Sequence, residues 1–112
     1  MITDVKQENN STVIEVSGSV DALTAPELSK VLLDQISDGN SRLVVSLLGV
    51  EFMSSAGLRT LLGAVKEARS NGGDLRIASA KPGVDKVLKM SGFHTIAKVF
   101  SSKEEAVSSF GS

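Results

Sequence analysis

Two adjacent hydroxyl groups, on Ser54 and Ser55, are the side chains in this sequence best placed to carry chemistry. An apolar run over 43–48, typical of a strand buried on both faces, precedes them, and a segment with helical spacing of leucines follows. A strand-to-helix corner exposes backbone N–H groups at the positive end of the helix dipole, where an anion is stabilised. A serine at this corner can therefore either cap the helix or accept a phosphoryl group.

The residue groups of common enzyme sites are missing from this sequence. Its one histidine, His94, has no second imidazole with which to share a metal ion, and the chain has no cysteine. The two serines do not lie in the Gly-x-Ser-x-Gly pattern of hydrolases, and the glycines form no phosphate-binding loop. We expect a protein without enzymatic activity, cofactor or metal ion. A small serine hydrolase that pairs Ser55 with His94 stays open as an alternative.

Composition indicates neither a nucleic-acid-binding protein nor a membrane-spanning one. The net charge is −1 without a long basic run, and the absence of Trp and Tyr leaves no aromatic platform for bases. No apolar run approaches the roughly 20 residues of a membrane span, and the N-terminus lacks the features of a signal peptide. We expect a soluble, cytoplasmic protein whose 112 residues form a single domain over 1–112.

The first elements expected are two short strands. Residues 2–7 and 12–17 alternate apolar and polar side chains, and the turn-forming pair Asn9-Asn10 separates them. Gly18 ends the second strand in this interpretation, and Asp21 lies in the connection that follows. The two strands predict an antiparallel hairpin at the edge of a sheet.

A first helix is expected over 24–36. Thr24 is its predicted N-cap, Pro26 fits the first turn, and Glu27 completes a capping box. Gly39 is the expected C′ residue, because glycine readily adopts the left-handed conformation that ends a helix.

The second helix is expected over 55–69. Ser55 is its predicted N-cap, because Ser54 lies nearer the end of the strand. Ala56 and Gly57 follow, and their small side chains would leave the Ser55 hydroxyl open to modification. The apolar face expected to pack on the sheet consists of Leu58, Leu61, Leu62 and Val65.

The rest of the chain continues to alternate strands and helices. Strands are expected over 74–79 and 97–100, and between them a helix begins at Pro82 and ends before Gly92. Residues 101–104 form a second capping-box pattern, which opens a terminal helix. We therefore expect an α/β fold with a small, mostly parallel sheet, an edge hairpin and about four packed helices.

Residues 52–58, after the apolar strand, resemble the signature loop of STAS domains, specifically those of bacterial anti-sigma-factor antagonists. Three further stretches fit that family in order and spacing. Residues 18–25 resemble its loop into the first helix, 72–75 its second helix-to-strand turn, and 82–93 its final helix and turn. The resemblance covers nearly the whole chain and implies a single STAS-type domain.

The resemblance also implies a regulatory protein that switches partners. Members of the family bind an anti-sigma factor that is also a serine kinase, and this binding releases a sigma factor. The kinase phosphorylates the loop serine and ejects the antagonist, and a metal-dependent serine phosphatase restores it. Other relatives are not phosphorylated and serve as scaffolds or as subunits of transport systems, so this alternative stays open.

By position, the resemblance makes Ser55 the phosphorylation site, with Ser54 as second choice. Ser54 stands where the family usually has Asp, so two adjacent hydroxyls compete and the acidic charge is missing. Partner contacts are expected from the same loop and from the connection before the first helix. The residues predicted to bind the partner are Asp21, Thr24, Met53, Ser54, Ser55, Ala56, Gly57 and Leu58.

Overall fold

Five strands form one sheet in the spatial order β1-β2-β3-β4-β5. They are β1 (Ile2–Glu8), β2 (Ser11–Val20), β3 (Arg42–Met53), β4 (Asp74–Ala78) and β5 (Val99–Phe100). The computed structural model describes residues 1–111. Strand β1 is antiparallel to β2, and the pairs from β2 to β5 are parallel. The predicted edge hairpin and mostly parallel sheet are confirmed.

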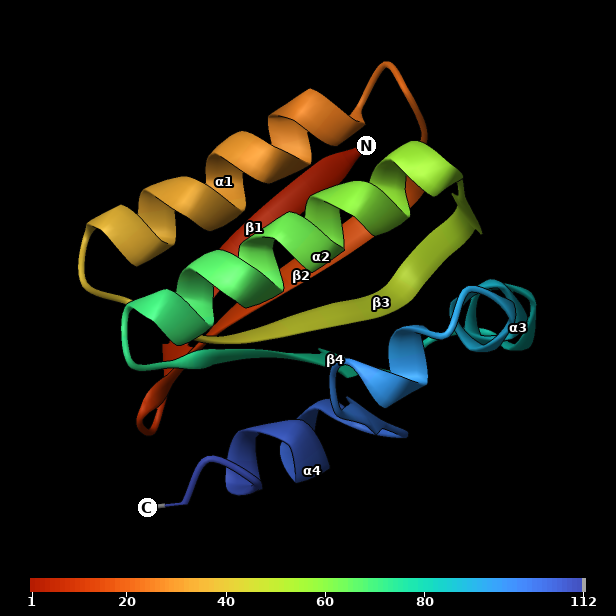
Figure 1. Cartoon of the computed structure of the whole chain (residues 1–112). Coiled ribbons are helices and arrows are strands. Elements are labelled where there is room, and N and C mark those ends of the chain that lie inside the picture. Colours follow the sequence, from red (N-terminus) through yellow and green to blue (C-terminus); the bar gives the residue numbers. More distant parts are fainter. Residues whose placement is uncertain (112) are drawn as a thin grey trace.

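The helices of the described chain are α1 (Ala25–Ser37), α2 (Ser55–Ser70), α3 (Pro82–Met90) and α4 (Lys103–Ser108). Helices α1 and α2 lie side by side over one face of the sheet, and α4 lies on the opposite side (Figure 1). Helix α3 lies near β3 at one end of the sheet. This is the expected α/β architecture.

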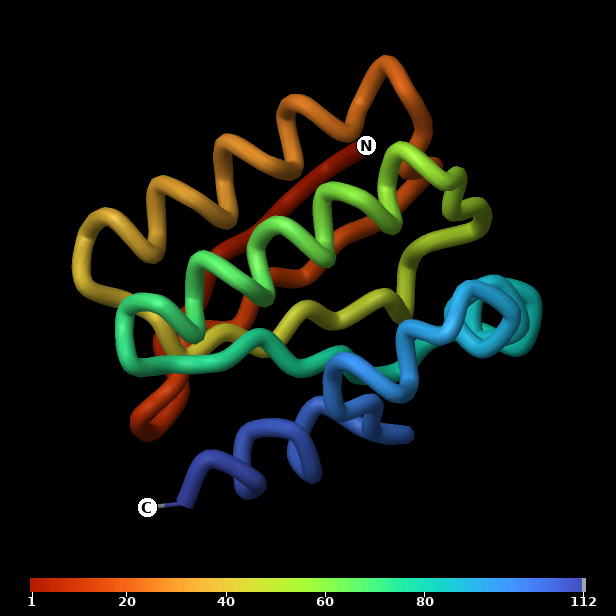
Figure 2. Tube along the Cα trace, in the orientation of Figure 1, coloured from red at the N-terminus to blue at the C-terminus, as the bar shows by residue number. Residues whose placement is uncertain are grey.

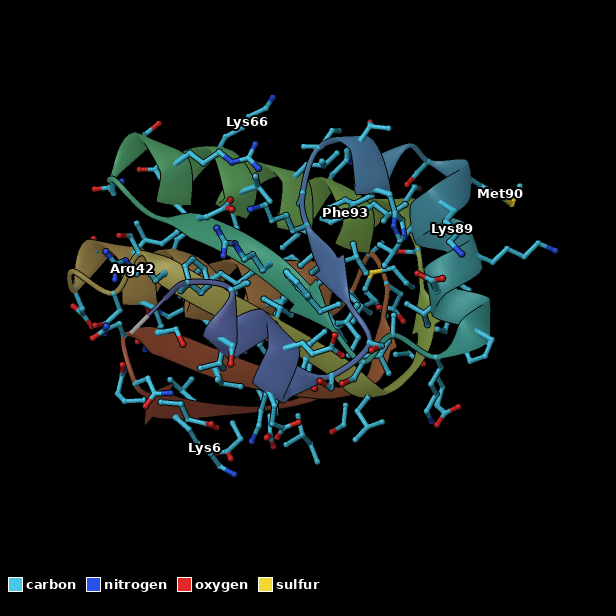
Figure 3. All side chains as sticks on the ribbon, turned by 90° about the horizontal axis from the view of Figure 1, so that it is seen from below. Lys6, Arg42, Lys66, Lys89, Met90 and Phe93 are labelled. Atoms are coloured by element: carbon cyan, nitrogen blue, oxygen red, sulfur yellow. The ribbon has the colours of Figure 1, made fainter. Side chains whose placement is uncertain are left out.

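Two cores, one on each face of the sheet, hold these layers together. The larger core lies between the sheet and helices α1, α2 and α3, and its one aromatic side chain is Phe93. In Figure 3, Phe93 lies inside the molecule, whereas Met90 projects outward from the end of α3. The smaller core joins the sheet to α4 and includes Val13 and Val44. The core is therefore mainly aliphatic, as the composition predicts.

The predicted apolar face of α2 packs on the sheet, with one position at its margin. Leu58, Leu61 and Val65 are buried, whereas Leu62 is only partly buried and packs against the edge of the core. Alanines complete the face at positions that the leucine pattern did not mark: Ala64 and Ala68.

Both strands that lead to the candidate site are longer than predicted. Gly18 does not end β2, which continues to Val20, and the strand predicted over 43–48 continues to Met53. Register shifts between β2 and β3 admit extra residues, so pairing resumes beyond each irregularity. Leu48, predicted to be buried, is 65% exposed, because it falls within the first irregularity and lines an open pocket of the sheet.

The glycines predicted to end helices do so, whereas one helix start is displaced. Gly39 and Gly92, after α1 and α3, have φ angles of +93° and +77°. Helix α4 begins one residue later than expected, because its N-cap is Ser102, which has an extended backbone. The Ser102 hydroxyl accepts a hydrogen bond from the N–H of Glu105 at 3.1 Å. The serine cap is therefore shifted by one residue, and the Glu105 carboxylate accepts a hydrogen bond from the Ser102 hydroxyl at 3.1 Å.

The last strand is shorter than predicted. Strand β5 contains only the second half of the predicted segment 97–100. The N–H of Ala97 donates instead to the carbonyl oxygen of Phe93 at 3.0 Å, which continues the 3-10 turn over Phe93–Thr95.

Candidate functional site

The candidate site lies where the parallel strands β2 and β3 end side by side. Val20 pairs with Met53 at the ends of these strands, and the N–H of Ser54 donates to the carbonyl oxygen of Val20 at 2.8 Å. The connection that follows β2 and the corner that follows β3 therefore emerge together at the same end of the sheet (Figure 2). The fold thus brings the two predicted stretches, 21–24 and 53–58, into one site.

The two serines occupy different positions at the start of α2. Ser54 is the N-cap, with an extended backbone, and its Oγ accepts a hydrogen bond from the N–H of Gly57 at 3.3 Å. Ser55 is the first residue of the helix, and its side chain is exposed. The prediction that Ser55 is the N-cap is therefore wrong. The reason is that β3 runs on to Met53, so the residue between strand and helix is Ser54.

Three of the predicted partner-binding residues point into the molecule and hold the corner in place. Met53, Gly57 and Leu58 are buried. A Cβ atom added to Gly57 would overlap the Met53 sulfur and lie 2.7 Å from Cγ1 of Val20. The first turn of α2 therefore packs directly on the strand ends, which leaves the Ser55 hydroxyl facing outward.

Asp21 and Thr24 form hydrogen bonds with each other that close the connection before α1 into a turn. One carboxylate oxygen of Asp21 accepts hydrogen bonds from the N–H groups of Leu23 and Thr24, at 3.0 and 3.1 Å. The Thr24 hydroxyl accepts the N–H of Asp21 at 2.9 Å and donates to the carbonyl oxygen of Ser19 at 2.9 Å. Thr24 stands at the N-cap position but caps no helical N–H, so the predicted capping box is wrong.

These hydrogen bonds change the acidity of Asp21. The N–H of Thr24 is the main reason why the pKa of the Asp21 carboxyl lies below its usual value, and the N–H of Leu23 adds to it. Desolvation opposes the change but does not outweigh it. The ionised carboxylate therefore keeps the connection in its closed turn near neutral pH.

Exposed apolar side chains flank the corner, and the sequence reasoning missed them. Leu23 is 90% exposed and Phe52 is 53% exposed. Leu23 precedes the predicted helix and fits no periodic pattern, which was the one signal available. The exposure of Phe52 could not be predicted from the sequence, because the length of β3 decides which way this side chain points.

A groove of about 610 Å³ runs between α1 and α2 from this corner. Small side chains line much of it, among them Ala25, Ala56 and Gly63, and its charged residues are Arg59 and Glu67. The groove joins two helices that are distant in the sequence, so no local pattern could predict it. It gives the corner a recessed surface on which another protein can dock.

The histidine of the alternative hydrolase hypothesis has a different partner. Nε2 of His94 lies 3.0 Å from Oδ1 of Asp85 on α3. Burial raises the pKa of the Asp85 carboxyl, but hydrogen bonds from Lys89 and His94 outweigh it, so the net pKa lies below the usual value. Within residues 1–111, no three His, Cys, Asp or Glu side chains are grouped to hold a metal ion. No helix in that range is both long and apolar enough to cross a membrane.

Comparison with known proteins identifies a matching family model and several relatives of this chain. The family model described as the STAS domain matches residues 3–106. BtrV of Bordetella bronchiseptica, provisionally named an anti-sigma factor antagonist, is 36% identical over 95 residues, which cover 85% of this chain and 82% of BtrV. The anti-sigma-B factor antagonist of Bacillus subtilis is 27% identical over 104 residues, which cover 93% of this chain and 94% of that protein.

A solved structure with the same fold is the anti-sigma factor antagonist SpoIIAA in its unphosphorylated form. It has a TM-score of 0.82 at 20% identity and covers 97% of this chain and 96% of its own. The phosphorylated form of SpoIIAA, from Bacillus, has a TM-score of 0.76 at 20% identity and covers 97% of this chain and 99% of its own.

Proposed function

This chain belongs to the STAS domain family, and from that premise we propose that it is an anti-sigma-factor antagonist controlled by phosphorylation of Ser55. The observation that carries the proposal is the exposed hydroxyl of Ser55 on the first turn of α2, beside the connection closed by Asp21 and Thr24. In this proposal the protein acts in the cytoplasm as one domain. It binds an anti-sigma factor with serine kinase activity and thereby releases a sigma factor.

The position of Ser55 suits a switch that leaves the fold intact. A phosphate adds about −1.5 to −2 charges and three strong hydrogen-bond acceptors. At the start of a helix, the dipole and the free N–H groups offset part of that charge. The similar fold of SpoIIAA has been solved in a phosphorylated form, which supports the compatibility of this fold with the modification.

The same phosphate would disrupt a partner docked over the corner. The partner would have to desolvate the phosphate, and unless the partner supplies a cation to pair with it the cost is of order several kcal/mol. Since each 1.4 kcal/mol is about tenfold in affinity, one modification is enough to break the complex. A serine phosphatase would restore binding.

The exposure of the residues at the corner indicates which of them could contact the partner. We propose that Asp21, Thr24, Ser54, Ser55 and Ala56 contact the partner, because each is at least partly exposed. The buried residues of the predicted set, Met53, Gly57 and Leu58, act by positioning this surface. The exposed Leu23 and Phe52 add apolar area at its rim.

The test begins with the protein that copurifies with the unphosphorylated chain. Incubation of this complex with ATP is expected to place phosphate on Ser55, detected by mass spectrometry, and to release the chain. Ser55→Ala is expected to stay bound in the presence of ATP. Ser54→Ala is the matched control for the acceptor, because it removes the neighbouring hydroxyl and keeps Ser55. The readout for this variant is phosphate on Ser55, which we expect as in the parent. Its affinity is not compared, since Ser54 is itself a proposed partner contact.

Other outcomes reject the proposal in distinct ways. Phosphate on Ser54, or on neither serine, contradicts the assignment of the acceptor. Copurification of transport components, rather than a kinase, supports the scaffold alternative. The observation that favours this alternative is Ser54, which stands where the family usually has Asp. Ester hydrolysis that depends on Ser55 supports the hydrolase.

A further inference from the structure

Arg59 lies one helical turn after Ser55 on α2. Its side chain is exposed, and the ion pairs formed by arginines of the described chain involve Arg69 and Arg76 rather than Arg59. The first turn of α2 contains no acidic residue that could compete for it. Within residues 1–111, Arg59 is therefore a cation without a carboxylate partner, and it lies next to the proposed phosphorylation site.

The spacing of the two residues suits a contact within the helix. Residues at i and i+4 have Cβ atoms about 5–6 Å apart, and the order acidic then basic is the favourable one. Helical side chains lean toward the N-terminus of their helix, so Arg59 leans toward the turn that carries Ser55. A guanidinium can donate two parallel hydrogen bonds to a phosphate.

We propose that a phosphate on Ser55 is held within the same chain by the guanidinium of Arg59, and that this contact withdraws Arg59 from the groove between α1 and α2. The inference rests on the proposed function, since it takes Ser55 as the acceptor. Arg59 is the one basic side chain among the described residues that line the groove, whose other charged residue is Glu67.

Phosphorylation then alters the partner surface in two places at once. It adds an anion at the corner, and it removes the cation that the groove offers to an acidic side chain of the partner. The groove keeps only the negative charge of Glu67. A partner whose acidic side chain pairs with Arg59 thereby loses that contact in the groove and also meets the new anion at the corner.

The test measures the second pKa of the phosphate itself. Phosphoserine is placed at position 55 during translation, and its ³¹P signal is followed against pH. The ordinary value is about 6. In the parent we expect a pKa about half a unit lower than in Arg59→Gln, as for an exposed ion pair. Arg59→Lys, which keeps the charge but loses the two parallel bonds, is expected to lie between them.

Lys66→Gln is the matched control. Lys66 lies on the same helix, is exposed and projects away from the molecule (Figure 3), about 16 Å from Ser55 along the helix axis. We expect this change to leave the phosphate pKa unaltered. We also expect the difference between the parent and Arg59→Gln to shrink at 1 M salt. Circular dichroism checks that all variants are folded.

Two results would overturn the inference. One is an equal phosphate pKa in the parent and in Arg59→Gln, and the other is an equal shift in Lys66→Gln. Because translation supplies the phosphate, these results do not depend on the partner kinase. A kinase that ignores Ser55, together with the expected pKa difference, would reject the proposed function and leave the contact with Arg59 supported.

Discussion

Two neighbouring serines have different roles because the helix begins between them. Ser54 ends the extended chain and turns its hydroxyl back to the N–H of Gly57, whereas Ser55 is already helical and turns its hydroxyl outward. The Ser54 hydroxyl is already hydrogen-bonded as the cap of α2. The exposed Ser55 hydroxyl can be modified without loss of the cap. The structure thus assigns the capping role to Ser54 and leaves the proposed acceptor role to its neighbour, Ser55.

This separation predicts different stabilities for two alanine variants. Ser54→Ala loses the cap and is expected to lower the free energy of unfolding by about 0.5–1 kcal/mol, at the low end for N-caps because the hydrogen bond is long. Ser55→Ala, with no helical N–H to release, is expected to stay within about 0.5 kcal/mol of the parent. Urea denaturation followed by circular dichroism measures both. A larger loss for Ser55→Ala would show that Ser55 is the cap.

A second prediction at this scale concerns the pH response of Asp21. Its pKa is lowered in the folded protein, mainly by the N–H of Thr24 and then by that of Leu23. Its contribution to stability is therefore present above the unfolded value of about 3.9 and is lost as the pH falls through the folded pKa. We expect the amide NMR signals of Leu23 and Thr24 to move together at a pH below 3.9.

Asp21→Asn supplies the control for this titration, since its amide oxygen still accepts a hydrogen bond but carries no titrating charge. The two amide signals should then stay in place over the same pH range. A midpoint at or above the ordinary Asp value in the parent would contradict the closed turn.

At the scale of the element, α2 is positioned by how closely its first turn approaches the strand ends. Gly57 permits this approach, because any Cβ there would meet Met53 and Val20. Gly63, six residues further along, faces open space in the groove. The same residue type therefore serves close packing at one position and lines open space at the other.

The two glycines predict opposite effects of the same substitution. Gly57→Ala is expected to destabilise the protein by about 1–3 kcal/mol, because the overpacked Cβ displaces the first turn. Gly63→Ala is expected to stabilise it by up to about 1 kcal/mol, because alanine favours the helix and meets no neighbour. Thermal and urea unfolding compare the two variants. If both gave the same sign, the contact between α2 and the strands would be looser than described.

At the scale of the molecule, one sheet carries two cores of unequal size. The larger core unites the sheet with α1, α2 and α3, and the smaller one joins it to α4. Buried strand residues alternate between them, as Val44 belongs to the smaller core and Val45 to the larger. The candidate site lies beside the larger core, at the end of the sheet, and depends on it for its geometry.

Because the two cores share the same strands, we expect the described chain to unfold as one cooperative unit. Calorimetry should give a single transition whose calorimetric and van't Hoff enthalpies agree. A phosphorylated sample should melt in the same single transition, since the modification lies outside both cores. An early transition confined to α4 and the last strand would show that the smaller core is a separate unit.

The sequence by itself determined the order of the elements and the place of the strand-to-helix corner that forms the candidate site. Periodicity marked α1, α2 and α3, and the glycines at 39 and 92 marked helix ends, because these signals depend only on neighbours in the chain. The serine pair after an apolar strand marked the corner for the same reason.

Only the tertiary structure decided which serine caps α2 and what surrounds the other. The end of β3 is set by its pairing with β2 beyond two register shifts, and that pairing places Ser54 rather than Ser55 at the cap. The groove with Arg59, and the burial of Met53 and Gly57, depend on how α1 and α2 pack together and on the sheet. Such contacts join residues distant in the chain, so local patterns carry no information about them.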